Sequence, residues 1–183
     1  MTISTIYKGL QYRLGKLRAR MYSLFPDIKI GGNTCIERRV FLSTRNGGTI
    51  KIGNNCYISE GAQVITEGGN ITIGNNCTIN PCSVVYGQGG TTIGNGVRIA
   101  AQCVIVPSNH IFENPNEFIW RQGLSKIGII IEDDVWLGAG VKILDGVTVS
   151  KGTVIGANAV VTHNTEPYGV YVGVPAKLIK RRK

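Results

Sequence analysis

An aliphatic residue returns every six positions along most of this chain, followed by a small residue, two polar residues or glycines, and a small or β-branched residue. The segments "IGNNCY" from Ile52 and "IGNNCT" from Ile73 show the pattern clearly. Hexapeptides of this kind begin at Ile30, Ile36, Ile52, Ile58, Ile73, Ile79, Ile93, Ile99, Ile131, Leu137, Ile143, Val149 and Ile155. A period of six with an inward aliphatic residue predicts one short strand and one tight turn in each repeat.

Three such hexapeptides would make one triangular coil, and each coil would pair its backbone N–H and C=O groups with those of the next coil. Glycine-rich insertions, "RNGGT", "TEGGN" and "GQGGT", recur at a spacing of roughly twenty residues. We therefore predict an all-β solenoid in which these insertions form a row of exposed loops along one corner.

The six-residue rhythm breaks in the stretch "VIVPSNHIFENP", which covers residues 104–115. It returns only near Ile131, so we expect a loop over residues 109–130 that protrudes from the solenoid. His110 is one of two histidines in the chain, and it lies where the rhythm stops.

The first residues follow a different period, because apolar residues recur there at alternating four- and three-residue steps. This spacing predicts an amphipathic α-helix over residues 3–24. Its apolar face comprises Ile3, Tyr7, Leu10, Leu14, Leu17, Met21 and Leu24. The opposite face is basic, so the helix either caps the solenoid, contacts a neighbouring subunit or touches a membrane. We expect a helical segment 1–26 and a β-helix domain 27–183, with a distinct C-terminal segment 165–183.

Composition agrees with short strands and many turns. The 183 residues include 25 glycines, and aromatic residues make up 7%, a mix that disfavours a helical bundle. The net charge of +9 gathers near the two ends of the chain, which suits a phosphorylated small molecule or an anionic membrane surface. No ribbon of aromatic and basic residues suggests a reader of nucleic acid, so we expect no nucleic-acid partner.

The sequence contains no uninterrupted apolar run typical of a signal peptide or a transmembrane helix. Its five cysteines form no CxxC pair. We assign Cys35, Cys56, Cys77 and Cys103 to a small position of the repeat, where we expect packing rather than metal or redox chemistry. A reduced, cytoplasmic protein fits these features best, and the N-terminal helix could hold it peripherally at the inner face of the membrane.

The C-terminal third, "IEDDVWLGAGVKILDGVTVSKGTVIGANAVVT" followed by "GVYVGVPAKLIKRR", resembles the sugar O-acetyltransferase branch of the hexapeptide-repeat acyltransferases. That branch includes galactoside and maltose acetyltransferases and enzymes that modify capsule and lipopolysaccharide sugars. The resemblance implies a left-handed parallel β-helix, a homotrimer with active sites in the clefts between subunits, acetyl-CoA as the acyl donor and a saccharide as the acceptor.

The resemblance also implies roles for individual residues. His110 matches a catalytic base at the start of a long loop, and Asn80, thirty residues earlier, matches an active-site asparagine. A sugar hydroxyl is a poor nucleophile at neutral pH, and an imidazole is well suited to take its proton. Asn109 stands where many relatives have Asp, and Trp120 and Gln122 match the part of the loop that faces the acceptor.

Donor-binding positions follow in the same way from the resemblance. Small residues whose backbone amides would pair with pantetheine, with an aromatic residue beside them, are Gly138, Ala139, Ala157, Thr162 and Trp136. Basic residues that would meet the phosphates of coenzyme A are His163, which replaces a lysine of many relatives, and Lys177, Lys180 and Arg181. A solvated basic tail is the alternative for the last three.

Other functions are compatible with a hexapeptide solenoid. An amino-sugar N-acetyltransferase would use the same kind of cleft. A zinc-dependent carbonic anhydrase of this fold needs three histidine ligands, and a chain with two histidines is a poor candidate, so we expect no metal site. A purely structural solenoid would have regular faces and no protruding loop with a histidine.

Overall fold

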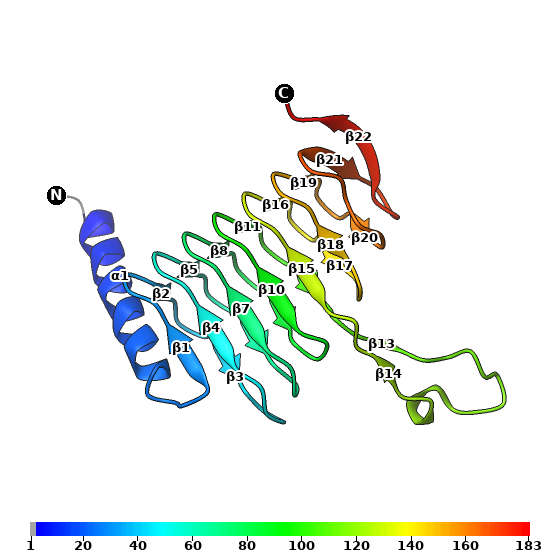
Figure 1. The fold of residues 1–183 in the computed structure, drawn as a ribbon. Coiled ribbons are helices and arrows are strands. Elements are labelled where there is room, and N and C mark those ends of the chain that lie inside the picture. Colours follow the sequence, from blue (N-terminus) through cyan, green and yellow to red (C-terminus); the bar gives the residue numbers. More distant parts are fainter. Residues whose placement is uncertain (1–2) are drawn as a thin grey trace.

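A computed structural model describes residues 3–183, with side chains from residue 9 onward. Helix α1 (Ile3–Tyr22) precedes a left-handed parallel β-helix of six coils (Figure 1). Each coil contributes one short strand to each of three sheets, so the solenoid is a three-sided prism. The fold class expected from the hexapeptide period is confirmed.

Each face of the prism is one sheet, and its strands are parallel except for β22 at the end of the second face. The first face holds β1 (Ile28–Ile30), β4 (Ile50–Ile52), β7 (Ile71–Ile73), β10 (Thr91–Ile93), β15 (Ile129–Ile131) and β18 (Thr148–Val149). The second face holds β2 (Cys35–Ile36), β5 (Tyr57–Ile58), β8 (Thr78–Ile79), β11 (Arg98–Ile99), β16 (Trp136–Leu137), β19 (Val154–Ile155), β21 (Gly169–Val172) and β22 (Lys177–Arg181). The third face holds β3 (Phe41–Ser43), β6 (Gln63–Ile65), β9 (Val84–Tyr86), β12 (Val104–Ile105), β17 (Lys142–Ile143) and β20 (Val160–Val161).

Equivalent residues of successive coils stack inside the prism. On the first face, Ile52, Ile73, Ile93 and Ile131 are aligned in register, and all four side chains are buried. Stiff β-branched residues suit this narrow interior, because each one presents the same shape to the residue above and below it.

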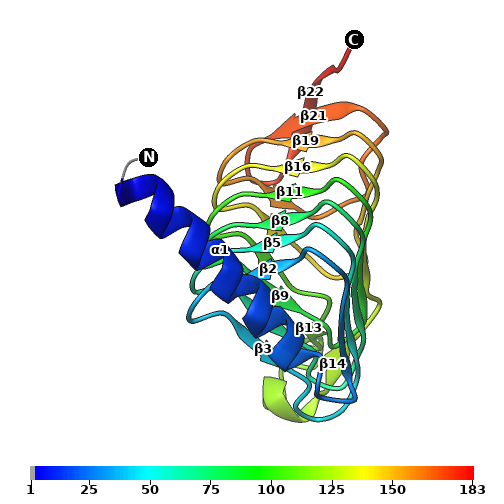
Figure 2. The ribbon, with the colours of Figure 1, turned by 90° about the vertical axis from the view of Figure 1, so that its left-hand side faces the viewer.

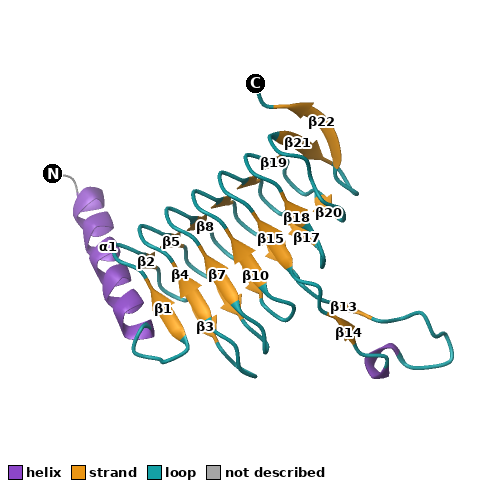
Figure 3. Ribbon diagram, viewed as in Figure 1, coloured by secondary structure: helices purple, strands orange, loops and turns teal. Residues whose placement is uncertain are grey.

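The turns between the faces form three edges (Figure 3). We call the turns between the first and second faces the first edge, those between the second and third faces the second edge, and those leading from the third face to the next coil the third edge. The glycine-rich insertions at 44–49, 66–70 and 87–90 all lie on the third edge, which confirms the predicted row of loops on one corner.

The long loop leaves from the third edge between β12 and β15, and we call its residues 106–128 the arm. Its elements are β13 (Asn109–His110), the 3₁₀ helix η1 (Ile119–Arg121) and β14 (Leu124–Ser125). The two strands pair antiparallel, and the arm projects away from the prism (Figure 1). The predicted loop 109–130 extended two residues too far, because Ile129 and Ile130 already belong to β15.

Helix α1 lies across the end of the first coil (Figure 2). Small residues make this close contact: a Cβ at Gly15 would lie 2.2 Å from Sγ of Cys35, and Ala19 is buried. The hydroxyl of Tyr22 donates a hydrogen bond to the carbonyl oxygen of Val40 at 2.9 Å. The helix therefore covers the backbone groups at the end of the solenoid, as the capping interpretation predicts.

The face of α1 that packs is not its apolar face. Leu10, Leu14, Leu17 and Met21 are exposed, and the side chains of Ile3 and Tyr7 lie outside the described residues. The helix ends at Tyr22, two residues earlier than predicted. An amphipathic helix ordinarily buries its apolar stripe, so this stripe is unexplained by the fold alone.

The other end of the prism is closed differently. Strand β21 pairs with β19, and β22 folds back antiparallel on β21. Arg182 then reaches two coils back, where its Nη1 lies 3.0 Å from Oδ2 of Asp134. Within residues 3–183 no helix has the length and hydrophobicity needed to cross a membrane.

The cysteines inside the prism pack as expected. The thiols of Cys56 and Cys77 each donate to a carbonyl oxygen of the next coil at 3.1 Å, and that of Cys103 does so at 3.2 Å. Burial raises the pKa of the Cys103 thiol above its ordinary value. Cys82 is exposed at a turn of the second edge.

Candidate functional site

His110 lies in β13, at the base of the arm, where it is paired across the hairpin with Leu124. The side chain is exposed, and its ring nitrogens have no hydrogen-bond partner among the residues that the structure describes. Asn109, next to it, is also exposed. The carboxylate of Glu113, three residues on, accepts a hydrogen bond from the backbone N–H of Phe112 at 3.0 Å rather than from His110. The imidazole is therefore available to an external partner.

The tip of the arm presents aromatic and basic groups. Trp120 is 69% exposed, and Cζ of Arg121 lies 4.9 Å from the centre of its ring. Gln122 has another role: its Nε2 donates to the carbonyl oxygens of Asn114 and Glu117 at 2.9 Å, and its Oε1 accepts from the N–H of Asn114 at 3.1 Å. The amide of Gln122 is thus engaged in folding the arm, whereas Trp120 is free to stack on a ligand.

Asp145, which the sequence analysis did not single out, holds the returning strand of the arm. Its carboxylate accepts from the N–H groups of Ile127 at 3.0 Å and Gly128 at 2.9 Å, and from the hydroxyl of Ser125 at 2.9 Å. Hydrogen bonds to a charged acceptor are stronger than neutral ones. In the sequence, the Asp–Gly pair that begins at Asp145, one coil beyond the break, is the feature that could have indicated this anchor for the arm.

The loop before the arm packs directly under its base. A Cβ at Gly89 would lie 2.3 Å from the carbonyl oxygen of Pro107 and 2.8 Å from the N of Gly128, so only glycine fits there. The neighbouring Gln88 has a buried Oε1 with no partner among the described residues. The third edge thus fixes the root of the arm from both sides, through Gly89 and through Asp145.

Asn80 lies elsewhere, on the second edge. Its Nδ2 donates to the carbonyl oxygen of Ile99 in the next coil at 2.9 Å, which leaves its Oδ1 available. The predicted donor positions Gly138, Ala139 and Ala157 lie on the same edge, two and three coils further on. The structure therefore aligns Asn80 with these small residues along one line parallel to the prism axis.

The second edge carries backbone donors without acceptors. In the fourth, fifth and sixth coils the equivalent turn residues are Ala101, which is half-buried, and Ala139 and Ala157, which are exposed. Their N–H groups have no acceptor within residues 3–183. An exposed amide of this kind is hydrogen-bonded to water or to a ligand. Alanine adds no acceptor of its own, so a row of outward N–H groups remains for carbonyl groups of a bound molecule.

The remaining predicted residues are divided between two regions. Trp136 is 54% exposed on the second face, and Lys177, Lys180 and Arg181 lie on β22 of the same sheet. Arg181 forms an ion pair with Glu166, so it is partly engaged within the chain. Thr162 and His163 lie instead on the third edge of the sixth coil, where Oγ1 and Nδ1 are 2.8 Å apart.

His110 and Asn80 are not brought together within one chain. They lie on different edges, separated by the width of the third face, on the order of 15 Å for about five residues of strand. The spacing of thirty residues corresponds to one coil and one further face. A single chain therefore offers two half-sites: the arm with His110 on the third edge, and the row of amides with Asn80 on the second.

Comparisons with known proteins agree with this coil geometry. Residues 128–163, which include the fifth and sixth coils, match the family model described as bacterial transferase hexapeptide (six repeats). The N-acyltransferase AntD from Bacillus cereus, in a crystal structure with dTDP and coenzyme A, superposes with a TM-score of 0.74 at 25% identity, over 85% of this chain and 84% of AntD. The match to the hexapeptide transferase model thus covers the last two coils, and the fold of most of the chain is that of AntD.

Curated relatives of this hexapeptide-repeat protein match over about half of it. A protein of Schizosaccharomyces pombe that bears the name acetyltransferase is 41% identical over 92 residues, 49% of this chain and 42% of its own length. WbbJ of Escherichia coli (strain K12), named for O-acetyl transfer in lipopolysaccharide biosynthesis, is 35% identical over 97 residues, 49% of this chain and 50% of its own. The chain thus spans half or less of these relatives.

Proposed function

We propose that this hexapeptide-repeat protein is an acetyl-CoA-dependent O-acetyltransferase that modifies a hydroxyl of a sugar or a cell-surface glycan. The observation that carries the proposal is an exposed, unpaired imidazole on a braced arm, in a chain that also presents a row of open amides on another edge. The similarity to acetyltransferases, to WbbJ among them, supports the same reaction class. We place the activity in the cytoplasm, where acetyl-CoA is made and thiols stay reduced.

The two half-sites lead us to propose a homotrimer. The arm extends from the third edge and cannot fold back across the third face, because Asp145 and Gly89 fix its root. A neighbouring subunit that faces the arm with its second edge would bring its own Asn80 and amide row toward His110. A cyclic assembly repeats this contact at each interface, so each site would use His110 from one subunit and the amide row from the next.

In the proposed reaction the imidazole of His110 takes the proton of the acceptor hydroxyl while the oxygen attacks the thioester carbon. The carbon–sulfur bond then breaks, and coenzyme A leaves as the thiol with that proton. No acyl group becomes attached to the protein. The amides of Ala139 and Ala157 would hold the pantetheine carbonyls, and Trp136 would flank them. Lys177, Lys180 and His163 are the proposed phosphate partners.

On the acceptor side, Asn80 would orient the sugar through its available Oδ1, and Trp120 would stack on the sugar ring. We assign Gln122 to the folding of the arm, because both of its amide hydrogens and its oxygen are engaged there. Asn109 lies beside the base and is exposed to the same space.

An amino-sugar N-acyltransferase is the second candidate, and the similarity to AntD favours it. AntD is an N-acyltransferase, and its structure contains dTDP. The same base and donor positions would serve an amino group, so the acceptor decides between the two functions.

The test measures thiol release from acetyl-CoA with paired acceptors that differ only in a hydroxyl or an amino group at one carbon. We expect turnover with hydroxyl acceptors, and His110→Ala should lower kcat by roughly 10²- to 10⁴-fold. Glu117→Ala, on the exposed part of the same arm, is the matched control and should retain activity. Full turnover by His110→Ala would exclude the mechanism, and turnover of the amino acceptors alone would assign N-acetylation.

Asp145→Ala tests the braced arm. Loss of three hydrogen bonds at the arm's root should let β14 move, and kcat should fall by roughly tenfold, since small displacements of a catalytic group are costly. Limited proteolysis should cut the arm faster than in the parent, while the melting temperature changes little. An unchanged kcat with an arm that is cleaved faster would show that His110 does not need this anchor.

A further inference from the structure

The exposed stripe of α1 is a continuous apolar surface at the closed end of the prism. Leu10, Leu14, Leu17 and Met21 fall on one side of the helix at about 3.6 residues per turn, and each is at least 37% exposed. The side that packs on the first coil, with Gly15 and Ala19, is the opposite one. The stripe therefore points away from the solenoid, where none of the described side chains, from residue 9 onward, covers it.

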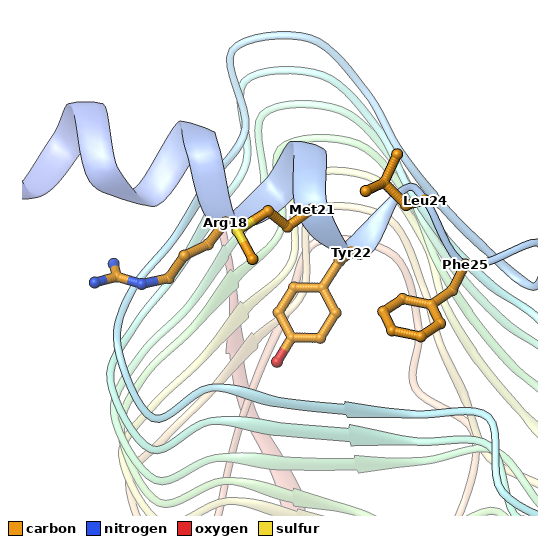
Figure 4. Close-up of a pocket in the computed structure, with 5 residues that line it drawn as sticks. All are labelled: Arg18, Met21, Tyr22, Leu24 and Phe25. Carbon is orange, nitrogen blue, oxygen red and sulfur yellow. The ribbon is translucent and has the colours of Figure 1, made fainter.

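The apolar surface continues past the end of the helix. Leu24 is 84% exposed and Phe25 is 59% exposed. Met21, Tyr22 and Phe25 lie next to one another at the end of the helix (Figure 4). With Arg18 and Leu24 they line a groove of about 410 Å³. The lining of the groove is mostly apolar.

The charges around the stripe have one sign. Residues 1–26 contain five lysines and arginines and no aspartate or glutamate. On the helical wheel, Arg13 and Arg20 flank the stripe on one side and Arg18 flanks it on the other. No carboxylate among the described residues forms an ion pair with any of these three arginines.

We propose that this surface, which comprises Leu10, Leu14, Leu17, Met21, Leu24 and Phe25 with the flanking Arg13, Arg18 and Arg20, binds an anionic lipid bilayer. A helix with an apolar face, a basic rim and no acidic residue lies in the interface of such a membrane, with the arginines at the level of the phosphates. The small-residue face stays on the first coil, so binding requires no rearrangement of the solenoid.

A second copy of the chain is a poorer occupant. A two-fold contact through this surface would place the same basic rim on both sides of the interface. Like charges would then face one another with no carboxylate to pair them. The membrane proposal goes beyond the acetyl-transfer function and does not depend on it.

The test is co-sedimentation of the full chain with vesicles of phosphatidylcholine alone, and of phosphatidylcholine mixed with phosphatidylglycerol. We expect at least tenfold stronger binding to the anionic vesicles. The double variant Leu14→Ser/Leu17→Ser should weaken that binding by more than tenfold, because two side chains no longer enter the apolar layer. Arg13→Gln/Arg20→Gln keeps the stripe and should weaken it by roughly 25-fold, about fivefold for each charge.

Phe118→Ser replaces an aromatic residue of the arm that is more exposed than Leu14 or Leu17, and this control should bind as the parent does. Circular dichroism checks that α1 persists in each variant. Failure of the parent to bind anionic vesicles overturns the proposal, as does unchanged binding by both double variants. A loss of binding confined to Phe118→Ser would move the membrane contact to the arm. A fall in oligomeric mass for the leucine variant, without vesicle binding by the parent, would identify a second copy as the occupant.

Discussion

The first and second edges of the prism are built from the same hexapeptide and present opposite chemistry. Along the first edge, a side-chain oxygen in each of coils two to five accepts the backbone N–H of the equivalent residue in the preceding coil. The N–H of Gly32 donates to Asn54, that of Asn54 to Asn75, that of Asn75 to Asn95, and that of Asn95 to Asp133. The N–O distances are 2.7, 2.8, 2.9 and 2.5 Å in that order. Along the second edge, the equivalent positions Ala101, Ala139 and Ala157 carry no acceptor.

The glycines differ between the two edges as well. On the first edge the residue after the strand is glycine in four successive coils: Gly31, Gly53, Gly74 and Gly94. On the second edge it is Ser59, Asn80 and Ala100 in coils two to four. In coils two to four the first edge is therefore closed on itself, with its amides satisfied and no room for a side chain. In coils five and six the glycines change edges: Gly138 and Gly156 follow the strands on the second edge, and Glu132 and Ser150 follow those on the first. The second edge leaves donors and side chains at the surface, where a ligand can use them.

We expect the largest loss of stability from a substitution that disrupts the first edge. In Gly74→Ala the new Cβ would lie 2.6 Å from the carbonyl oxygen of Gly94 and 2.8 Å from Oδ1 of Asn95. Two coils would have to separate, and we expect a loss of roughly 2–3 kcal/mol, or a melting temperature lower by roughly 5–10 °C in thermal denaturation. Gly9→Ala, with no atom within 4 Å of its new Cβ, is the control and should melt at or slightly above the parent temperature. An unshifted transition for Gly74→Ala would show that the first edge is not tightly packed.

Much of this closed structure was readable from the sequence, because the repeat dictates it. A fixed period places the same residue type at the same corner of each coil, so the stacked isoleucines and the row of loops at 44–49, 66–70 and 87–90 followed from the pattern. The break in the rhythm located the arm for the same reason. Its end was misplaced by two residues, because the next hexapeptide was read from Ile131, whereas β15 already begins at Ile129.

A smaller loss of stability is expected when one of the side-chain hydrogen bonds along the first edge is removed. Asn75→Ala removes the oxygen that accepts two hydrogen bonds from Asn54, one from its backbone N–H and one from its Nδ2 at 3.1 Å. The edge is exposed and water can replace part of this, so we expect a loss of about 1 kcal/mol. The melting temperature should fall by about 2–4 °C, while the affinity for coenzyme A stays the same. Thr72→Ala, exposed on the first face of the same coil, is the control. A change in coenzyme A affinity would mean that the first edge is also a binding surface.

Spacing along the chain could not place the site. Asn80 and His110 are separated by thirty residues, and only the coil geometry shows that this interval ends on another edge. The role of Asp145 depends on where the arm returns, and that of Gln122 on how the arm folds upon itself, and neither is periodic. The outward direction of the leucine stripe on α1 also required the structure, since the small face of Gly15 and Ala19 is inconspicuous beside it.

A substitution on the second edge, Ala139→Pro, should have a smaller effect, and that effect should be on binding. The third coil already has proline, Pro81, at the position of Ala139, followed by a residue with positive φ, Cys82 at 58°. Ala139 is followed by Gly140 at 71°, so Ala139→Pro fits the same turn and deletes little more than the N–H. One lost hydrogen bond should weaken coenzyme A binding by roughly fivefold in isothermal titration calorimetry.

The fold should not suffer from the same change. A proline in a compatible turn restricts the unfolded chain, and the melting temperature of Ala139→Pro should stay level or rise slightly. Ala139→Gly keeps the N–H and is the matched control for the side chain, with affinity close to the parent's. Asn75→Ala and Ala139→Pro would then separate the two edges: one lowers stability and leaves binding, the other lowers binding and leaves stability. Parental affinity in Ala139→Pro would instead show that the open amides of the second edge donate to water alone, and the donor would have to bind along another edge.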